Sequence, residues 1–351
     1  MQSEKHTYLQ DFLAKLPDFV YEYIEMYYNG ESVNTKIGYS IDIRIFFEYL
    51  IKMKFKELTS PEQLTEAHLE QVTAADLLRF KAYLKEYVSE YTAPDGSRVA
   101  CTRRNSNFGI NRKLSSIRGL FTYLYKIDRL SQNVTDKVDM NKLHQKIKKP
   151  LTTQETVRLI NVIFHGEEYF SGRNLTEYLR NKQRDITIFI TYLGTGVRVS
   201  ELVNLNIGDI SFDTDSFIVT RKGGDQQEIF MPPQVCEELK TYLTERLKNE
   251  KATDEQAVFL SRQNRRITVS AVEKLLKKYC ETAGIFDPDK SRPHALRRTF
   301  ACRLLEDGVD IKMVAELMGH KNIEVTHKHY AQYDTKARRE VMRHITIINE
   351  D

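Results

Sequence analysis

Residues 291–330 read SRPHALRRTFACRLLEDGVDIKMVAELMGHKNIEVTHKHY, and the rest of the chain is organised around this stretch. Apolar residues recur at helical spacing on both sides of an Asp-Gly pair, which predicts two amphipathic helices separated by a turn. His294 and Arg297 lie one helical turn apart, so both side chains can face the same small anion. Gly319 is placed to end the second helix as a C-cap, which turns His320 away from the core. Tyr330 follows in a loop rich in His and Lys. Together these residues predict a site for a negatively charged group.

A second basic group lies upstream, in residues 191–210, TYLGTGVRVSELVNLNIGDI. After the Gly-Thr-Gly turn a new helix is expected to begin with Arg198 in its first turn and Glu201 three residues later. An arginine at a helix N-terminus opposes the macrodipole unless an anion binds there. Residues 215–232, DSFIVTRKGGDQQEIFMP, alternate apolar and polar side chains around Lys222. This pattern predicts a β-hairpin with the lysine at its tip or at the end of a strand.

The order and setting of these residues resemble one known family. The motifs are G-x-R-x-S-E-L, a lysine on a hairpin, H-A-L-R, Gly-His and a following tyrosine. On them the chain resembles the tyrosine recombinases, also called the lambda-integrase family, with six matched catalytic positions: Arg198, Lys222, His294, Arg297, His320 and Tyr330. Tyr330 stands ten residues after His320, and Tyr333 is the alternative nucleophile.

The resemblance implies a mainly α fold with a small β-sheet, an α+β protein with an all-helical N-terminal core-binding domain before the catalytic domain. We expect a DNA-clamping domain at 1–130, a basic linker at 131–150, a catalytic domain at 151–335 and a tail at 336–351 that contacts a neighbouring protomer. Residues 166–184 look like an inserted loop or short helix between the start of the catalytic domain and the 191–210 stretch.

Each catalytic position has an expected role in breaking a DNA phosphodiester without water. Tyr330 would attack phosphorus and hold the strand as a 3′-phosphotyrosyl ester. Arg198 and Arg297 match two phosphoryl oxygens with planar forks, and His320 adds a donor. Lys222 would protonate the leaving 5′ oxygen while His294 helps to take the tyrosine proton, although the spacing does not decide which of these two is the base. Glu201 is expected to orient Arg198.

Candidate DNA contacts outside the catalytic set are basic residues in the first 150 positions. Arg103 and Arg104 precede a helix that also carries a basic stripe with few acidic interruptions, which favours phosphate contacts over a merely solvated face. The full set of predicted DNA-binding residues is Lys36, Arg44, Arg103, Arg104, Arg112, Lys113, Arg118, Lys148 and Lys149.

Composition excludes several other classes of protein. The 351 residues carry 53 basic and 49 acidic side chains, so nucleic-acid binding must come from clustered rather than bulk charge. Four scattered cysteines indicate reduced thiols, and no run is long and apolar enough to cross a membrane. We expect a cytoplasmic, nucleoid-associated protein. His327 and His329 with His320 do not complete a zinc site, because no Cys or carboxylate joins them. No metal or nucleotide cofactor is expected.

We therefore predict that the chain is a site-specific recombinase that acts through a Holliday junction. We expect it to work as a homotetramer on two duplex DNA sites, and accessory proteins are possible further partners. Xer-type resolution of chromosome or plasmid dimers is the first setting, and integration or excision of a mobile element or phage is the alternative. A type IB topoisomerase is a less favoured alternative, which would use similar chemistry but relax supercoils without synapsis or strong site preference. A non-catalytic DNA-binding regulator is disfavoured, because a pure binder has no need of a nucleophile.

Overall fold

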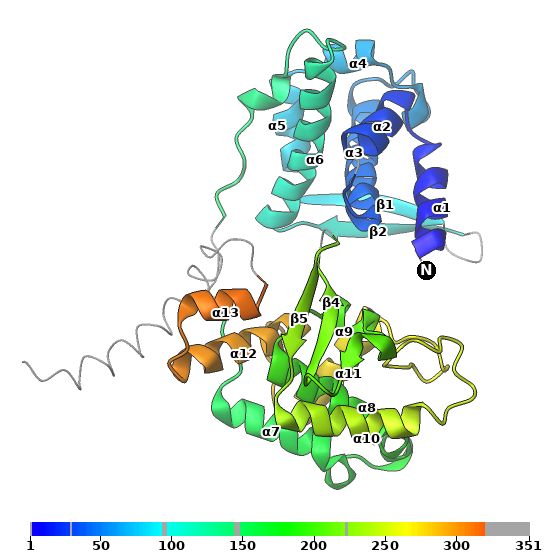
Figure 1. The fold of residues 1–351 in the computed structure, drawn as a ribbon. Helices are drawn as coiled ribbons and strands as arrows, with labels where there is room; N and C mark the ends of the chain where they lie inside the picture. Colours follow the sequence, from blue (N-terminus) through cyan, green and yellow to red (C-terminus); the bar gives the residue numbers. More distant parts are fainter. Residues whose placement is uncertain (1, 29, 93–96, 144–147, 222–223, 320–351) are drawn as a thin grey trace, which may run out of the picture. The chain divides into compact units, whose positions relative to one another are not determined.

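The computed structural model describes residues 2–28, 30–92, 97–143, 148–221 and 224–319. The chain divides into two compact units, Met1–Gln145 and Lys146–Asp351, each with its own hydrophobic core (Figure 1). Helices dominate both units, and each also contains one small antiparallel sheet. The expected mainly α fold with a small β component is confirmed.

The first unit is built around two long helices, α3 and α6, which pack side by side (Figure 1). Ser32 caps the start of α3 and Ser106 caps the start of α6 through their side chains. Phe46 and Phe121 meet between these helices in a core without solvent access. The elements of this unit are α1 (Gln2–Leu13), α2 (Asp18–Glu22), the π-helix η1 (Tyr23–Tyr27), α3 (Val33–Met53), η2 (Pro61–Gln63), α4 (Glu66–Glu70), α5 (Ala74–Tyr83), β1 (Glu86–Thr92), β2 (Arg98–Arg104), α6 (Asn107–Lys126) and η3 (Val134–Lys137).

The expectation of an all-helical first unit is wrong, because β1 and β2 form an antiparallel hairpin between α5 and α6. Leu84 and Tyr87 are both buried and lie three residues apart, a spacing that suits the next turn of a helix as well as the start of a strand. The residues that follow are mainly Tyr, Val, Ser and Thr, which favour the extended backbone. Strand propensity therefore prevails where the apolar spacing is ambiguous.

The boundary between the units falls after Gln145, within the stretch expected to be a linker. The first part of that stretch contains η3, and Val134 and Val138 are buried in the core of the first unit. Arg118 on α6 donates to the carbonyls of Thr135 and Val138, which holds this segment in place. These apolar and polar contacts attach the segment to the first unit.

The second unit is built around α8, which packs against α7, α10 and α12. A three-stranded antiparallel sheet in the order β3-β4-β5 lies beside these helices (Figure 1). The elements are α7 (Thr153–Phe164), η4 (Gly166–Glu168), α8 (Gly172–Thr195), α9 (Val199–Asn204), η5 (Ile207–Asp209), β3 (Ile210–Ser211), β4 (Ser216–Thr220), β5 (Gln226–Phe230), α10 (Pro233–Arg246), α11 (Val269–Thr282), α12 (Pro293–Glu306) and α13 (Ile311–Leu317).

Residues 166–184 do not form an inserted loop or a short helix, because they contain η4 and the first half of the 24-residue helix α8. Tyr178 is fully buried, and its hydroxyl donates to the carbonyls of Ile163 and Phe164. Its ring covers Gly166 so closely that a Cβ there would lie 2.5 Å from it. Tyr178 therefore anchors the first half of α8 to the core of the second unit.

Candidate active site

The site begins where α8 ends. Gly196 caps this helix in the left-handed conformation, with φ of 61°, and a Cβ at this position would lie 2.3 Å from the ring of Phe300. Only glycine fits both the backbone angle and the close approach of α12. The turn allows α9 to begin at once, and Arg198 becomes the N-cap residue of α9.

Arg198 donates two hydrogen bonds to Glu201 at the start of α9. One Glu201 carboxylate oxygen accepts from the Arg198 backbone N–H at 2.8 Å, and the other accepts from Arg198 Nη1 at 2.8 Å. Burial alone would raise the pKa of the Glu201 carboxyl, but the bonds from Arg198 and the charge of Arg221 outweigh burial and lower that pKa. Glu201 is therefore a carboxylate that offsets the unfavourable position of an arginine at a helix N-terminus.

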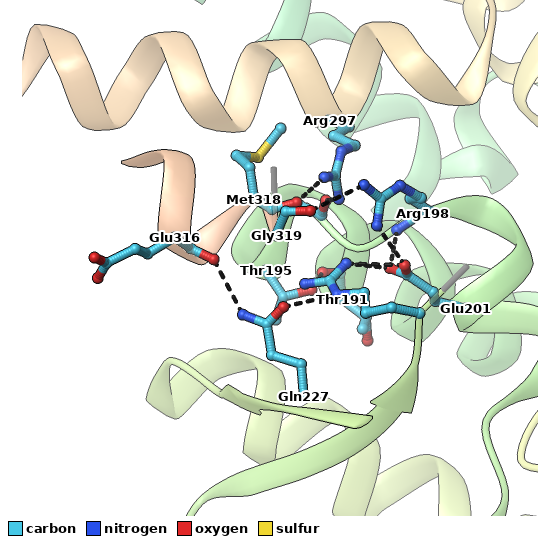
Figure 2. A network of polar contacts seen from close by, with 11 residues as sticks. Thr191, Thr195, Arg198, Glu201, Gln227, Arg297, Glu316, Met318 and Gly319 are labelled. Carbon is cyan, nitrogen blue, oxygen red and sulfur yellow. Dashed lines mark hydrogen bonds and ion pairs between the residues drawn. The ribbon is translucent and has the colours of Figure 1, made fainter. Parts of the chain in front are cut away.

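Arg297, on α12, links this helix to the turn after α8 and to the end of α13. Its buried guanidinium donates to the carbonyl oxygens of Gly196 and Met318. Nη2 of Arg198 donates to the next carbonyl, that of Gly319, at 3.2 Å (Figure 2). The two guanidinium groups therefore converge on successive backbone oxygens at the C-terminus of α13, immediately before His320 in the sequence.

His294 lies one turn before Arg297, in the first turn of α12, and its side chain is exposed. The surrounding protein still removes enough water to lower the pKa of the imidazole, and the nearby charges of Arg297, Arg298 and Arg198 lower it further. Both effects disfavour the imidazolium. The neutral ring that results near pH 7 is able to accept a proton.

The structure thus brings together Arg198, Glu201 and Arg297, and it places His294 on the same end of α12 as Arg297. The remaining predicted catalytic residues, Lys222, His320 and Tyr330, and the alternative Tyr333, lie outside the described residues.

One buried residue at this site was not predicted from the sequence. Arg221 immediately follows β4, and its Nη1 lies 2.8 Å from both carboxylate oxygens of Glu201. The alternation of buried and exposed residues along β4 could have predicted that Arg221 is buried. Phe217 and Val219 are buried on one face of β4, and Arg221 continues the same period of two. A charged residue at an inward position is costly and needs a partner, and Glu201 supplies it.

The predicted DNA-binding residues fall into two groups by environment. Lys36 is buried and ion-paired with Glu25 at 2.7 Å, and Lys113 is buried and donates to the side-chain oxygen of Asn105 at 3.2 Å. Arg118 is committed to the carbonyls near η3 described above. The residues with at least part of the side chain open to solvent are Arg44, Arg103, Arg104, Arg112, Lys148 and Lys149.

Within the described ranges, no three His, Cys, Asp or Glu side chains are grouped as metal ligands. No helix in those ranges is long and apolar enough to cross a membrane.

Replacing Glu201 with glutamine is expected to destabilise the second unit by about 3 kcal/mol at pH 7, because two arginines lose a buried charge partner. The pKa of Glu201 is lowered by folding, so its contribution to stability is complete above the ordinary value of 4.5 and is lost as the pH falls below it. Urea unfolding midpoints should therefore differ most between wild type and Glu201→Gln at neutral pH, and the difference should shrink as the pH falls from 4.5 through the lowered pKa of Glu201.

The exposed carboxylate of Glu245 on α10 offers the matched control, Glu245→Gln. A midpoint difference for Glu201→Gln that stayed constant from pH 7 to pH 3 would contradict the role of this carboxylate.

Comparison with known proteins identifies the family to which the chain belongs. The model of the Phage integrase family matches residues 171–337. The tyrosine recombinase XerC of Caldanaerobacter subterraneus subsp. tengcongensis is 30% identical over 336 residues, which cover 93% of this chain and 86% of that protein. The tyrosine recombinase XerS of Streptococcus thermophilus is 28% identical over 339 residues, with 91% and 92% covered.

Two solved structures illustrate that other proteins share this fold. The Tn1549 transposon integrase in complex with transposon right-end DNA has a TM-score of 0.64 at 22% identity, covering 93% of this chain and 99% of that one. The XerH recombinase bound to its difH substrate has a TM-score of 0.59 at 18% identity, covering 89% and 79%. The order of the predicted catalytic residues in the sequence, the matched family model and the similarity to XerC over 93% of this chain agree. The chain belongs to the tyrosine recombinase family and is a site-specific recombinase.

Proposed function

We propose that this recombinase cleaves and rejoins duplex DNA through a 3′-phosphotyrosyl intermediate and a Holliday junction, as a homotetramer on two sites, to resolve chromosome or plasmid dimers. The observation that carries the proposal is the convergence of Arg198 and Arg297 at the end of α13, directly before His320. Relatives named XerC and XerS span almost the whole chain, which supports the Xer-type setting. We place its action in the cytoplasm, at the nucleoid.

The two arginines suit a phosphoryl group in both geometry and charge. A guanidinium presents paired donors in a plane, matches phosphoryl oxygens bidentately and keeps its charge at every working pH. In this structure the same donors contact neutral carbonyl oxygens. A phosphodiester is a stronger, anionic acceptor, so we expect it to compete for these donors when DNA binds.

In the proposed cleavage step the phenolic oxygen of Tyr330 forms a bond to phosphorus as the bond from phosphorus to the 5′ oxygen breaks. His294, whose lowered pKa keeps the ring unprotonated at neutral pH, accepts the phenolic proton. Lys222 donates a proton to the leaving 5′ oxygen. The ester retains the energy of the broken bond, so attack by a 5′ hydroxyl of the other DNA reverses the step without ATP.

We propose that the solvent-accessible basic residues Arg44, Arg103, Arg104, Arg112, Lys148 and Lys149 contact DNA phosphates. Arg44, Arg104, Arg112 and Lys148 also form ion pairs within the protein, but between 42% and 78% of each of these side chains stays exposed. Lys36 and Lys113 are buried, and Arg118 is held by backbone carbonyls. Phosphate contacts of this kind should make binding fall steeply with salt.

The function is tested with a supercoiled plasmid that carries two direct copies of a candidate site from the DNA adjoining the gene. The proposal predicts conversion to two circles and a four-way junction that accumulates when strand exchange is slowed. Efficient joining of unlike sites on separate molecules, without resolution of direct repeats, would favour a mobile-element integrase. Relaxation without synapsis would indicate a type IB topoisomerase, and specific binding without any strand cleavage would indicate a regulator.

Deleting residues 336–351, which lie outside the described residues, should spare binding to a single site and weaken pairing of two sites. This segment contains Val341, Met342, Ile345 and Ile348, an apolar stripe suited to a groove on a neighbouring protomer. Gel-shift titration with one-site and two-site DNA separates the two effects. Full recombination by the truncated protein would refute this role.

A further inference from the structure

We infer that Arg221 is a positioning residue for cleavage, and that it fixes the β4–β5 hairpin next to Lys222 against both Glu201 and the end of α13. The inference rests on the proposed function, in which Lys222 protonates the leaving 5′ oxygen. It concerns a residue outside the six matched catalytic positions.

Arg221 is anchored to two different elements through its guanidinium. Nη1 lies 2.8 Å from each carboxylate oxygen of Glu201, the residue that also holds Arg198. Nε donates to the side-chain oxygen of Gln227, in β5, at 2.7 Å. The side chain is almost fully buried, at 7% exposure. Arg221 therefore ties the hairpin to the carboxylate that orients Arg198.

The same guanidinium also packs against the end of α13. Gly319 has φ of 58°, and a Cβ built on it would lie 2.6 Å from Cζ and 2.7 Å from Nε and Nη2 of Arg221. Gln227, the acceptor for Arg221, donates through Nε2 to the carbonyl of Glu316 at 3.0 Å (Figure 2). The last turn of α13 is thus held from the hairpin side by Arg221 and Gln227, while Arg198 and Arg297 bind its final carbonyls.

This arrangement is costly if it serves stability alone. Burying an ion pair gains little over apolar residues of similar volume. In addition, Nη2 of Arg221 is buried without a hydrogen-bond partner among the described residues. A buried donor left without a partner destabilises the folded protein. We infer that this loss of stability is tolerated because Arg221 fixes the positions of its neighbours.

The neighbours in question are catalytic. Lys222 follows Arg221 directly in the chain, and His320 follows Gly319. Consecutive Cα atoms lie about 3.8 Å apart, so fixing Arg221 limits the positions that Lys222 can reach. A displacement of about 1 Å in a catalytic group can cost about 100-fold in rate. Loosening Arg221 should therefore act mainly on proton donation to the leaving group.

The test compares Arg221→Met with Arg246→Met in single-turnover cleavage of nicked suicide DNA. Arg246 is a similarly buried arginine of the same unit, and its hydrogen-bond partners among the described residues are the carbonyls of Asp254, Glu255 and Ala257. Each variant is assayed on ordinary DNA and on DNA with a 5′-bridging sulfur at the scissile position. A thiolate leaves without a proton, so the sulfur substrate does not need a general acid.

We expect Arg221→Met to bind DNA within about 2-fold of wild type and to cleave ordinary DNA about 10- to 100-fold more slowly per folded molecule. The deficit should shrink to a few-fold on the sulfur substrate. Arg246→Met should lower the unfolding midpoint without a substrate-dependent loss of rate. Gln227→Leu, at a partly exposed position, should show a smaller deficit with the same rescue, and it decides the question if Arg221→Met does not fold.

Equal rates for wild type and the Arg221 and Gln227 variants would overturn the inference, as would a deficit of the same size on both substrates. These outcomes require a wild-type protein that forms the covalent adduct. A wild-type protein that forms no adduct on any candidate site would instead overturn the proposed function, and this inference with it.

Discussion

Replacing Arg297 with lysine is expected to lower the rate of DNA strand cleavage about 1,000-fold, since losing one preorganised donor to a developing oxyanion costs about 100- to 1,000-fold. The guanidinium spans two carbonyl oxygens, those of Gly196 and Met318, from a buried position on α12. A lysine ammonium is a point charge that cannot reproduce this fork. The positive charge remains in the lysine variant, so the decrease in cleavage rate measures the contribution of the planar guanidinium geometry.

The rate is measured by single-turnover cleavage at saturating DNA and is corrected for the fraction of folded protein, because the two carbonyls also lose a buried donor. Arg303→Lys is the matched control, since Arg303 is exposed near the other end of the same helix. A cleavage rate for Arg297→Lys within a few-fold of that for Arg303→Lys would contradict a role for Arg297 at the phosphoryl group.

Replacing Tyr330 with phenylalanine is expected to abolish the covalent DNA adduct while leaving DNA affinity within about 2-fold of wild type. In the proposed mechanism the phenolic oxygen forms the bond to phosphorus, and the phenylalanine ring carries no nucleophile that could take its place. Phenylalanine retains the ring, so packing in the surrounding segment changes little. The measurement is a denaturing gel of protein mixed with a nicked suicide substrate.

Tyr333→Phe is the control for this second prediction, because it removes a hydroxyl three residues later in the same segment. An adduct that persists in Tyr330→Phe and disappears in Tyr333→Phe would move the nucleophile to Tyr333.

The helix termini at the site were predictable from sequence because local rules govern them. A Gly-Thr-Gly turn followed by Arg198 and Glu201 indicated the start of a helix with an arginine in an unfavourable place. The structure shows two hydrogen bonds from Arg198 to the Glu201 carboxylate, which compensate for it. The one-turn spacing of His294 and Arg297 indicated a shared helix face, and both lie on α12. Local spacing was sufficient in these cases.

Long-range pairing was not predictable in the same way. The ion pairs of Arg221 with Glu201 and of Lys36 with Glu25 join residues on different elements. Nothing in the neighbouring residues reports such a partner. For the same reason Lys36 resembled a surface lysine in the sequence. The β1–β2 hairpin was mistaken for part of a helical unit because the spacing of Leu84 and Tyr87 suits a helix as well as a strand. Strand alternation through Arg221 was the one local signal of burial.

The most direct test of the account is to locate the covalent bond in the wild-type protein. The adduct formed on a nicked suicide substrate is digested with nuclease and trypsin, and the modified peptide is sequenced by mass spectrometry. The peptide HYAQYDTK, residues 329–336, contains both candidate tyrosines. The account predicts a nucleotide attached through phosphate to Tyr330. Attachment to Tyr333, attachment outside this peptide, or the absence of any adduct from DNA that is bound would contradict it.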